Sequence, residues 1–296
     1  MMPIWKSNLS AIPVGLYEKA LPAALSWYER LLATRRAGYD FLEISIDDSD
    51  RRIARLDWKT QERTALRQAV QDTAVPILSM SLSSHRRFAL GSASEKTRQT
   101  ALDIFAKAID LAVELGLRLI LVAGAENYYE ERDAGSQERF LESLGHAFEW
   151  AAAAGVMLAL ENWDIQINSI SRAMRYVNYF NSPWFQLYAD IGNLAHAGLD
   201  IVSQLEIGRG HIAAVHVKDT LPGQLRYVPP GEGVVPFEQS FAALASMEFQ
   251  GPVTLELWTE SLPNAIELVT EARSWLQTMM EVGWQAAQMT ELLCKS

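Results

Sequence analysis

The chain has 296 residues, of which 49% are hydrophobic and 21% charged, and this length can bury the core of one large α/β domain or of two smaller ones. Its formal net charge of −10 disfavours nucleic acid as a partner, because binding to a phosphate backbone requires clustered Lys and Arg. The one cysteine, Cys294, excludes an internal disulfide and a cysteine-based zinc site. The N-terminal residues show neither a signal peptide nor an apolar span, so we expect a cytoplasmic protein without a membrane partner.

Short apolar runs recur along the chain, and helical patterns separate them. The runs expected to form strands are residues 12–17, 41–47, 76–83, 117–124, 156–162, 185–192, 212–219 and 252–258. Apolar residues recur at helical spacing in the segments between them, among them residues 22–38, 57–73 and 94–116. Eight strands that alternate with helices in a chain of this length predict a single (β/α)8 TIM barrel.

A doubly wound parallel sheet is the alternative architecture, but no GxGxxG fingerprint follows the first expected strand. The chain contains no linker-like tract rich in Pro, Gly or Ser and no block of like charges. We therefore expect one domain over residues 1–296, with residues 283–296 as an additional C-terminal helix or tail.

Polar residues alternate with apolar residues in several of the expected strands. In residues 41–47, Glu43, Ser45 and Asp47 share one face of the strand, and in residues 212–219 His216 and Lys218 do so. Strands of a parallel sheet are usually covered on both faces and almost entirely apolar, so a simple amphipathic strand explains this pattern poorly. Polar residues near the carboxyl ends of barrel strands are instead typical of an active site.

Three acids and a histidine stand late in four successive expected strands. They are Glu161, Asp190, His216 and Glu256, separated by 29, 26 and 40 residues. One βα unit spans roughly 30 residues, so this spacing brings all four to one rim of a barrel. Three carboxylates so close together would repel one another without a cation. An oxygen-rich set with one imidazole predicts a divalent metal, and Mn²⁺, Mg²⁺ or Zn²⁺ would suit it.

The other histidines do not join this pattern. His146 and His196 fall in expected helices or loops, and His211 precedes the seventh strand and would face the opposite end of the barrel. We interpret these three as structural residues.

Several segments resemble the L-ribulose/L-xylulose 5-phosphate 3-epimerases of the xylose-isomerase-like TIM barrels. They are GLYEKALP, RLDW, SSHRRFALGS, NSPWFQLYADIGNL, GHIAAVHVKDT, GEGVV and LELWTE, and together they extend over nearly the whole chain. The family's metal ligands, a Glu, an Asp, a His and a Glu, map onto Glu161, Asp190, His216 and Glu256. Asn162 and Trp163 differ from the apolar residues of related sequences, which alters the packing beside Glu161.

The resemblance implies a 3-epimerase that interconverts L-xylulose 5-phosphate, or a hexulose 6-phosphate, with L-ribulose 5-phosphate or its counterpart. A metal would stabilise a cis-enediolate, and Glu161 and Glu256 would act as the acid and the base on opposite sides of C3. Zn²⁺ or Mn²⁺ would be the metal, with Mg²⁺ or Co²⁺ as alternatives. The resemblance also implies a cytoplasmic homodimer that takes part in L-ascorbate degradation.

A 5-phosphate needs cationic side chains or helix N-termini to bind it. The segment after the third strand supplies His85, Arg86 and Arg87, although surface ion pairs would explain these arginines equally well. Lys218 follows His216 on the same strand face and is a candidate for binding a substrate hydroxyl or phosphate. Asn193 is a candidate for a substrate hydroxyl, and Lys19 is a weaker candidate. Tyr17 and Trp258 are candidate walls of the pocket.

Four other functions use the same barrel. An aldose–ketose isomerase or a 3-epimerase that acts on free sugars would use the same metal but leave the phosphate-binding arginines idle. A repair endonuclease needs more histidines and a basic DNA-binding face than this chain, with its five histidines and net charge of −10, provides. A non-catalytic sugar-phosphate sensor would not need two acid–base residues, so Glu161 and Glu256 disfavour it.

Overall fold

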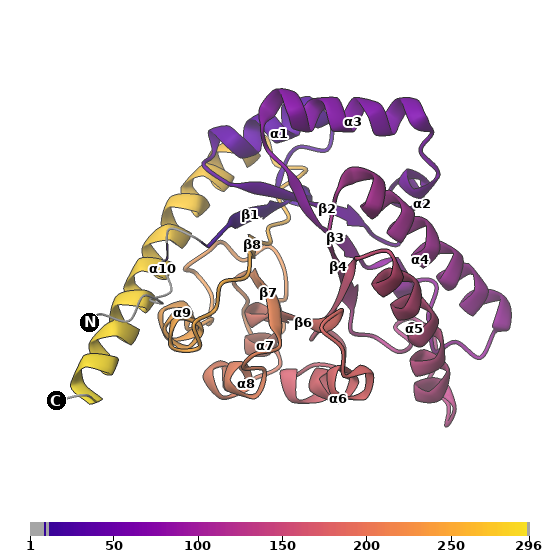
Figure 1. The fold of residues 1–296 in the computed structure, drawn as a ribbon. Coiled ribbons are helices and arrows are strands. Elements are labelled where there is room, and N and C mark those ends of the chain that lie inside the picture. The colour runs from indigo at the N-terminus through magenta and orange to yellow at the C-terminus, as the bar shows by residue number, and fades with distance from the viewer. Residues whose placement is uncertain (1–8, 10–11, 295–296) are drawn as a thin grey trace.

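The strands form a closed barrel in which each strand pairs with its neighbours in sequence and the last pairs with the first (Figure 1). The structure is a computed structural model that describes residue 9 and residues 12–294. All the pairings are parallel. The strands are β1 (Val14–Tyr17), β2 (Phe41–Ile46), β3 (Ile77–Leu82), β4 (Leu119–Ala123), β5 (Met157–Glu161), β6 (Phe185–Asp190), β7 (Ile212–Val217) and β8 (Val253–Leu255).

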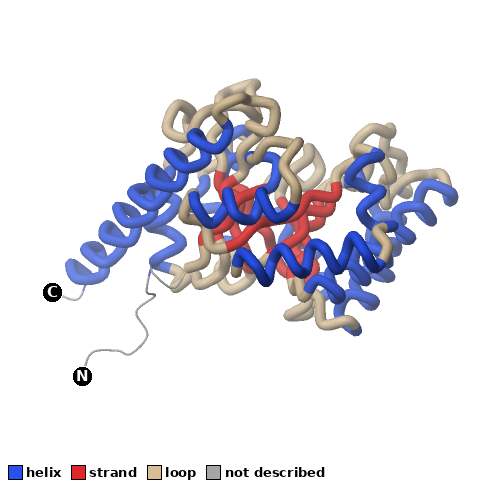
Figure 2. Tube along the Cα trace, turned by 90° about the horizontal axis from the view of Figure 1, so that it is seen from above, coloured by secondary structure: helices blue, strands red, loops and turns tan. Residues whose placement is uncertain are grey.

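Helices connect the strands and surround the barrel, as the view from above shows (Figure 2). The α-helices are α1 (Trp27–Arg36), α2 (Asp50–Ile53), α3 (Thr60–Thr73), α4 (Glu95–Leu115), α5 (Ser136–Ala153), α6 (Ile170–Phe180), α7 (Ile191–His196), α8 (Ile201–Ile207), α9 (Phe237–Ser246) and α10 (Ala265–Cys294). The short 3₁₀ helices are η2 (Glu18–Ala20), η3 (Ala54–Asp57) and η4 (Ser84–Arg86).

Local capping residues explain where several helices begin and end. The hydroxyl of Ser26 accepts a hydrogen bond from the backbone N–H of Glu29, whose carboxylate accepts one from the N–H of Ser26, a capping box at the start of α1. At the start of α4 the hydroxyl of Ser94 accepts a hydrogen bond from the backbone N–H of Thr97. Gly116 ends α4 with φ of +77°, a left-handed conformation that glycine adopts without strain.

The eight expected strands and the TIM barrel are confirmed, and the doubly wound sheet is not found. Every strand lies within its predicted range, usually one or two residues shorter at the ends. Residues 283–294 continue α10 instead of forming a separate element, and α10 packs against α9 along one side of the barrel (Figure 1). No helix in the described part of the chain is long and apolar enough to cross a membrane.

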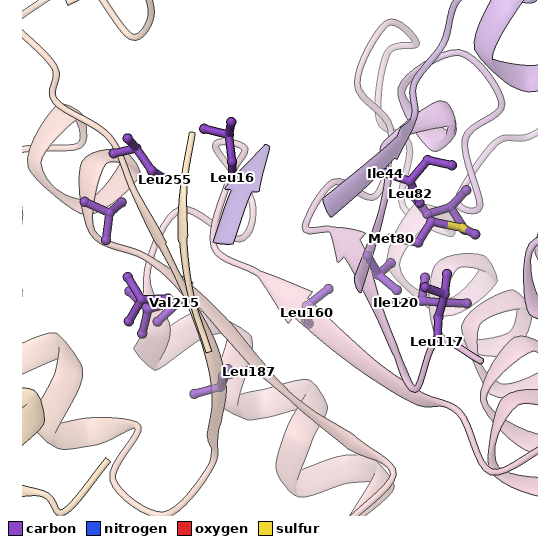
Figure 3. Packing of buried hydrophobic residues seen from close by; sticks show 14 of the residues in the cluster. Leu16, Ile44, Met80, Leu82, Leu117, Ile120, Leu160, Leu187, Val215 and Leu255 are labelled. Atoms are coloured by element: carbon purple, nitrogen blue, oxygen red, sulfur yellow. The ribbon is translucent and has the colours of Figure 1, made fainter. Parts of the chain in front are cut away.

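The two faces of the strands have different roles. Apolar side chains such as Leu16, Met80, Leu160 and Val215 point away from the barrel axis and form one buried core beneath the surrounding helices (Figure 3). The alternate positions are largely polar and face the barrel interior, where Tyr188 packs in a second buried cluster with leucine and alanine side chains. Apolar and polar residues alternate along the strands in the sequence. In the structure the apolar set packs against the helices, and the polar set faces the barrel interior.

Candidate metal centre

The four predicted ligands come together at the carboxyl ends of successive strands. Glu161 ends β5, Asp190 ends β6, His216 is the penultimate residue of β7, and Glu256 immediately follows β8. One ligand atom from each lies within 4.8 Å of the others, and all four side chains are buried. The register places Asp190 directly beside His216 on the neighbouring strand. The barrel geometry thus converts the regular spacing of the sequence into a compact set of donors.

This donor set fits a divalent metal. Three carboxylates and one imidazole are the hard and borderline ligands that Zn²⁺, Mn²⁺ and Mg²⁺ accept. Nδ1 of His216 lies 3.1 Å from Oε1 of Glu161, 3.7 Å from Glu256 and 3.9 Å from Asp190, so this nitrogen faces the carboxylates. The imidazole donor and the three acids therefore point to a common centre.

An ammonium group already neutralises part of the acid cluster. Nζ of Lys218 donates hydrogen bonds to Asp190 at 2.6 Å and to Glu256 at 2.7 Å, with all three side chains buried. Burial alone would lower the pKa of Lys218, but the carboxylates of Asp190 and Glu256 outweigh it and raise that pKa above its ordinary value. The cluster is thus built to hold positive charge.

The two candidate acid–base residues experience different environments. Burial raises the pKa of Glu161 to about 7, and the hydrogen bond from His216 only partly opposes this rise. Burial acts in the same direction on Glu256, but the charges of Lys218 and His216 are stronger and lower the pKa of that carboxyl below its usual value. Two carboxyl groups whose pKa values are moved apart are typical of an acid–base pair.

A further buried carboxylate lies behind His216 and was not among the predicted ligands. Oε1 of Glu43, on β2, lies 2.7 Å from Nε2 of His216, the nitrogen that points away from the acid cluster. Oε2 of Glu43 accepts hydrogen bonds from Ser79 at 2.6 Å and from Tyr188 at 2.8 Å. The alternation of residues 41–47 placed Glu43 on the polar face, but no sequence spacing linked it to the histidine.

A cavity opens beside the three acids and the histidine. It is lined by Tyr17, Lys19, Ser81, Ser83, Arg86, Ala123, Glu161, Trp163, Lys218, Arg226, Glu256 and Trp258. Glu161 and Glu256 therefore reach both the candidate metal centre and the cavity. Tyr17 and Trp258 lie in the wall, as expected, and Trp163 joins them.

Three of the predicted substrate-binding cations line this cavity. They are Lys19, Arg86 and Lys218. Lys19 pairs with Asp47 at 2.6 Å, and Arg86 pairs with Asp48 at 2.5 Å while its guanidinium lies over the ring of Trp163. Nε of Arg86 is buried without a hydrogen-bond partner among the described residues, so a donor remains there for a ligand.

The other predicted substrate-binding residues lie elsewhere. His85 is buried and stacks on Phe105 of α4, with ring centroids 4.3 Å apart. The side chain of Arg87 is 47% exposed and pairs with Asp50. None of His85, Arg87 and Asn193 is among the residues that line the cavity.

Asn193 instead organises the backbone around Asp190. Its N–H donates to Oδ1 of Asp190 at 2.8 Å, and its amide donates to the carbonyl of Asn162 at 2.9 Å. The side chain of Asn162 brackets the backbone of Asp190 with two hydrogen bonds of 2.9 Å. Asn162 therefore couples the ends of β5 and β6, where two candidate ligands stand.

Arg226 is a cavity cation that the sequence did not indicate. Its guanidinium lies 4.9 Å from the ring centroid of Trp258, and its buried Nε has no hydrogen-bond partner in the described part of the chain. Arg226 belongs to the long connection between β7 and α9, which carries no periodic pattern. The one feature of the sequence that could have indicated Arg226 as a cavity residue is that it is a basic residue in the segment that follows the seventh strand.

The carboxylate of Asp219 holds that connection in place. It accepts hydrogen bonds from the backbone N–H groups of Gly231 at 2.9 Å and Gly233 at 2.8 Å, and at 3.3 Å from that of Val235. A Cβ at Gly233 would lie 2.1 Å from Oδ1 of Asp219, so the backbone can approach only without a side chain. The segment GEGVV thus wraps the carboxylate and returns the chain toward the cavity.

Comparisons with known proteins identify the family of this chain. The L-ribulose-5-phosphate 3-epimerase UlaE of Escherichia coli O1:K1 / APEC is 46% identical over 270 residues, covering 91% of this chain and 95% of that protein. UlaE of Salmonella paratyphi C (strain RKS4594) is 47% identical with the same coverage. The profile described as a xylose isomerase-like TIM barrel matches residues 31–279.

Solved structures share the architecture at lower sequence identity. The structure of L-ribulose 3-epimerase superposes with a TM-score of 0.76 at 19% identity and covers 94% of this chain and 98% of its own. The apo 3-keto-D-glucoside 4-epimerase YcjR from E. coli gives a TM-score of 0.75 at 21% identity and covers 90% and 99%. This chain therefore belongs to the xylose isomerase-like TIM barrel family and, within it, to the family of the L-ribulose-5-phosphate 3-epimerases UlaE.

Proposed function

We propose that this protein is a divalent-metal-dependent 3-epimerase that interconverts L-xylulose 5-phosphate and L-ribulose 5-phosphate. The observation that carries the proposal is the cluster of Glu161, Asp190, His216 and Glu256, which opens onto a cavity that also holds cations. The identity of 46% to L-ribulose-5-phosphate 3-epimerases over 91% of the chain supports the choice of substrate. It also supports a place in L-ascorbate degradation.

The four clustered residues would hold the metal, with Zn²⁺ or Mn²⁺ preferred and Mg²⁺ or Co²⁺ as alternatives. When bound, the ion would supply Lewis-acid stabilisation of the negative charge that develops on the C2 and C3 oxygens of the substrate.

The protein side chains supply the proton transfers. Epimerisation removes the proton from C3 and returns one to the opposite face, so two groups must approach from different sides. Glu161 on β5 and Glu256 after β8 both reach the cavity and come from strands that are not adjacent in the barrel. One takes the C3 proton, the other delivers a proton, and the two exchange roles in the reverse direction. Lys218, between Asp190 and Glu256, stabilises the negative charge that forms on the sugar oxygens.

The phosphate of the substrate would bind at the side of the cavity formed by Lys19 and Arg86. Both cations line the cavity, and the buried Nε of Arg86 lacks a partner among the described residues. Arg86→Ala should raise KM for the ketose phosphate strongly and leave activity on the free ketose unchanged. Arg87→Ala is the matched control, because Arg87 is adjacent, exposed and outside the cavity lining. Equal effects of both substitutions would refute this placement.

The reaction itself is tested by proton NMR in D₂O with metal-loaded protein and L-xylulose 5-phosphate or L-ribulose 5-phosphate. We expect the C3 proton signal to disappear as the epimer forms, and EDTA to stop the change. Loss of the C1 proton with formation of an aldose would replace the proposal with an isomerase. Absence of exchange on any ketose or ketose phosphate, with metal bound, would favour a sugar-phosphate sensor.

We further propose that the enzyme works in the cytoplasm as a homodimer, as the family resemblance implies. Light scattering coupled to size-exclusion chromatography tests the dimer, for which a chain mass of 33.1 kDa gives the reference. A single species at the monomer mass across the micromolar range would refute it.

A further inference from the structure

We propose that Glu43 is a positioning residue that holds the imidazole of His216 with Nδ1 toward the candidate metal centre. The inference rests on the metal-dependent function proposed above. Glu43 is buried and is not one of the four candidate ligands. Its proposed role is to orient His216, which supplies the one nitrogen ligand of that set.

The geometry divides the two ring nitrogens of His216 between different tasks. Nε2 lies 2.7 Å from Oε1 of Glu43, whereas Nδ1 faces Glu161 at 3.1 Å. A carboxylate only accepts hydrogen bonds, so Glu43 requires a proton on Nε2, whereas a metal bound among Glu161, Asp190 and Glu256 would displace any proton from Nδ1. The lone pair of Nδ1 is then directed at the acid cluster, which is the tautomer that a metal ligand requires.

Glu43 is itself held by side chains from two other strands. Oε2 of Glu43 accepts hydrogen bonds from Ser79 on β3 and Tyr188 on β6. Because Tyr188 gives its one proton to Glu43, the hydroxyl of Thr254, 2.9 Å away, donates to the Tyr188 oxygen. Each of these side chains is fully buried. The carboxylate has therefore no freedom to release the ring and turn toward another partner.

The partners of Glu43 indicate that this carboxylate has a functional role and does not serve only to fill the core. Glu43 is fully buried, and the transfer of a carboxylate into such a place is costly unless charged partners compensate it. Its three partners are two hydroxyls and the imidazole of His216, the one partner that can carry a positive charge, and no Lys or Arg in the described part of the chain forms an ion pair with it. An apolar side chain would fill this position with less cost, so the acid is best explained by what it does to His216.

The test measures metal affinity directly, without substrate. Metal-stripped wild type, Glu43→Gln and Ser45→Ala are titrated with Mn²⁺, and free Mn²⁺ is read from its EPR signal. Ser45→Ala is the matched control, since it removes a buried hydroxyl from the same strand that bonds Tyr17 and touches neither Glu43 nor His216. We expect Glu43→Gln to weaken Mn²⁺ binding about 10- to 100-fold and Ser45→Ala to leave it unchanged.

A second readout distinguishes positioning from catalysis. At saturating Mn²⁺, Glu43→Gln should regain most of the wild-type kcat, because the missing function is orientation of a ligand. Mn²⁺ affinity of Glu43→Gln equal to that of the wild type overturns the inference. The wild-type titration separates the two proposals. If the wild type itself binds no divalent metal, the proposed metal-dependent function fails, whereas unchanged affinity in Glu43→Gln overturns only the role of Glu43.

Two milder substitutions keep the inference testable if Glu43→Gln does not fold. Ser79→Ala and Tyr188→Phe each remove one donor to Glu43 and leave its carboxylate beside His216. We expect each to weaken Mn²⁺ binding several-fold, and the double variant to weaken it further. Wild-type affinity in the double variant would overturn the inference.

Discussion

Nζ of Lys218 lies 2.6 Å from Oδ2 of Asp190 in the interior of the barrel, at a site where the neighbouring groups are mostly acids. The same ammonium contacts Glu256 at 2.7 Å. Lys218 therefore acts as a permanent cation within a cluster that is arranged for a second, exchangeable one. Because Lys218 and a bound metal ion would both neutralise the same acids, their effects on the free energy of unfolding can be measured separately from activity.

Replacement of Lys218 should destabilise the metal-free protein more than the metal-loaded protein. Lys218→Met leaves Asp190 and Glu256 buried without their cation, and breaking a buried pair costs about 3–5 kcal/mol. A bound divalent ion would compensate part of that loss. The measurement is the free energy of unfolding in urea, with EDTA and with Mn²⁺.

Lys107→Met is the control for this prediction. Lys107 pairs with Asp57 at the surface, with side chains 48% and 62% exposed, and such pairs contribute about 0–1 kcal/mol. Equal losses for Lys218→Met with and without metal would show that the ammonium does not share the charge of the cluster.

Removal of the metal should lower the thermal stability of the wild-type protein. A ligand that binds only the folded state stabilises it by about 2.7 kcal/mol at 100 times its dissociation constant. We expect the Tm to fall on addition of EDTA and to return with excess Mn²⁺ or Zn²⁺. Asp190→Asn, which loses a charged donor from the cluster, should show a much smaller response. A Tm of the wild type that ignores both EDTA and metal would contradict the assignment of the site.

Glu161→Gln and Glu256→Gln should each stop proton exchange at C3 in both reaction directions. Loss of a general acid or base typically lowers the rate by about 10²–10⁴-fold. NMR in D₂O at saturating metal measures this exchange, and metal affinity must be determined in parallel because both residues are also candidate ligands. Glu232→Gln, an exposed glutamate in the β7–α9 connection, is the control and should retain full activity. Exchange at the wild-type rate in Glu161→Gln would exclude it as the acid or base.

His85 should make the stability of the protein depend on pH between about pH 6.5 and pH 4. Burial lowers the pKa of His85 to about 4 in the folded protein, against about 6.5 in an unfolded chain. Within this interval the unfolded chain binds a proton that the folded protein does not, so the free energy of unfolding falls as the pH falls. The complete loss amounts to about 3 kcal/mol and is reached below pH 4.

Urea unfolding of the wild type and of His85→Leu at pH 7 and pH 5 measures this contribution. The variant should lose less stability than the wild type between the two pH values. His146→Gln, whose ring is exposed on α5, should behave like the wild type. Parallel behaviour of His85→Leu and the wild type would show that the buried ring does not cause the pH dependence.

Gly233→Ala should disturb the connection that carries Arg226 while the barrel remains folded. The new Cβ would lie 2.1 Å from Oδ1 of Asp219 and 2.4 Å from the carbonyl oxygen of Thr220, so the loop must leave the carboxylate. We expect a higher KM and a small change in Tm. Gly145→Ala, in α5, meets its nearest atom at 4.0 Å and should have neither effect. Wild-type KM for Gly233→Ala would show that the loop does not shape the cavity.

The sequence by itself determined the barrel and the core of the site. Both follow from local, regular signals: apolar runs at intervals of one βα unit and residues that alternate between the two faces of a strand. Glu161, Asp190, His216 and Glu256 could be found because strand ends in a parallel barrel must meet at one rim. Lys218 was found for the same reason, since it continues the face of β7 that carries His216.

The tertiary structure alone decided which residues surround that core. Glu43 lies 173 positions before His216, and Arg226 and Asp219 act through an irregular loop, so no periodicity joined them to the site. His85, Arg86 and Arg87 are adjacent in sequence, yet the turn of η4 sends one into the core beside Phe105, one into the cavity and one to the surface. Strand alternation is fixed by local backbone geometry, whereas the direction of a loop side chain depends on distant packing and charge partners that only the folded chain brings together.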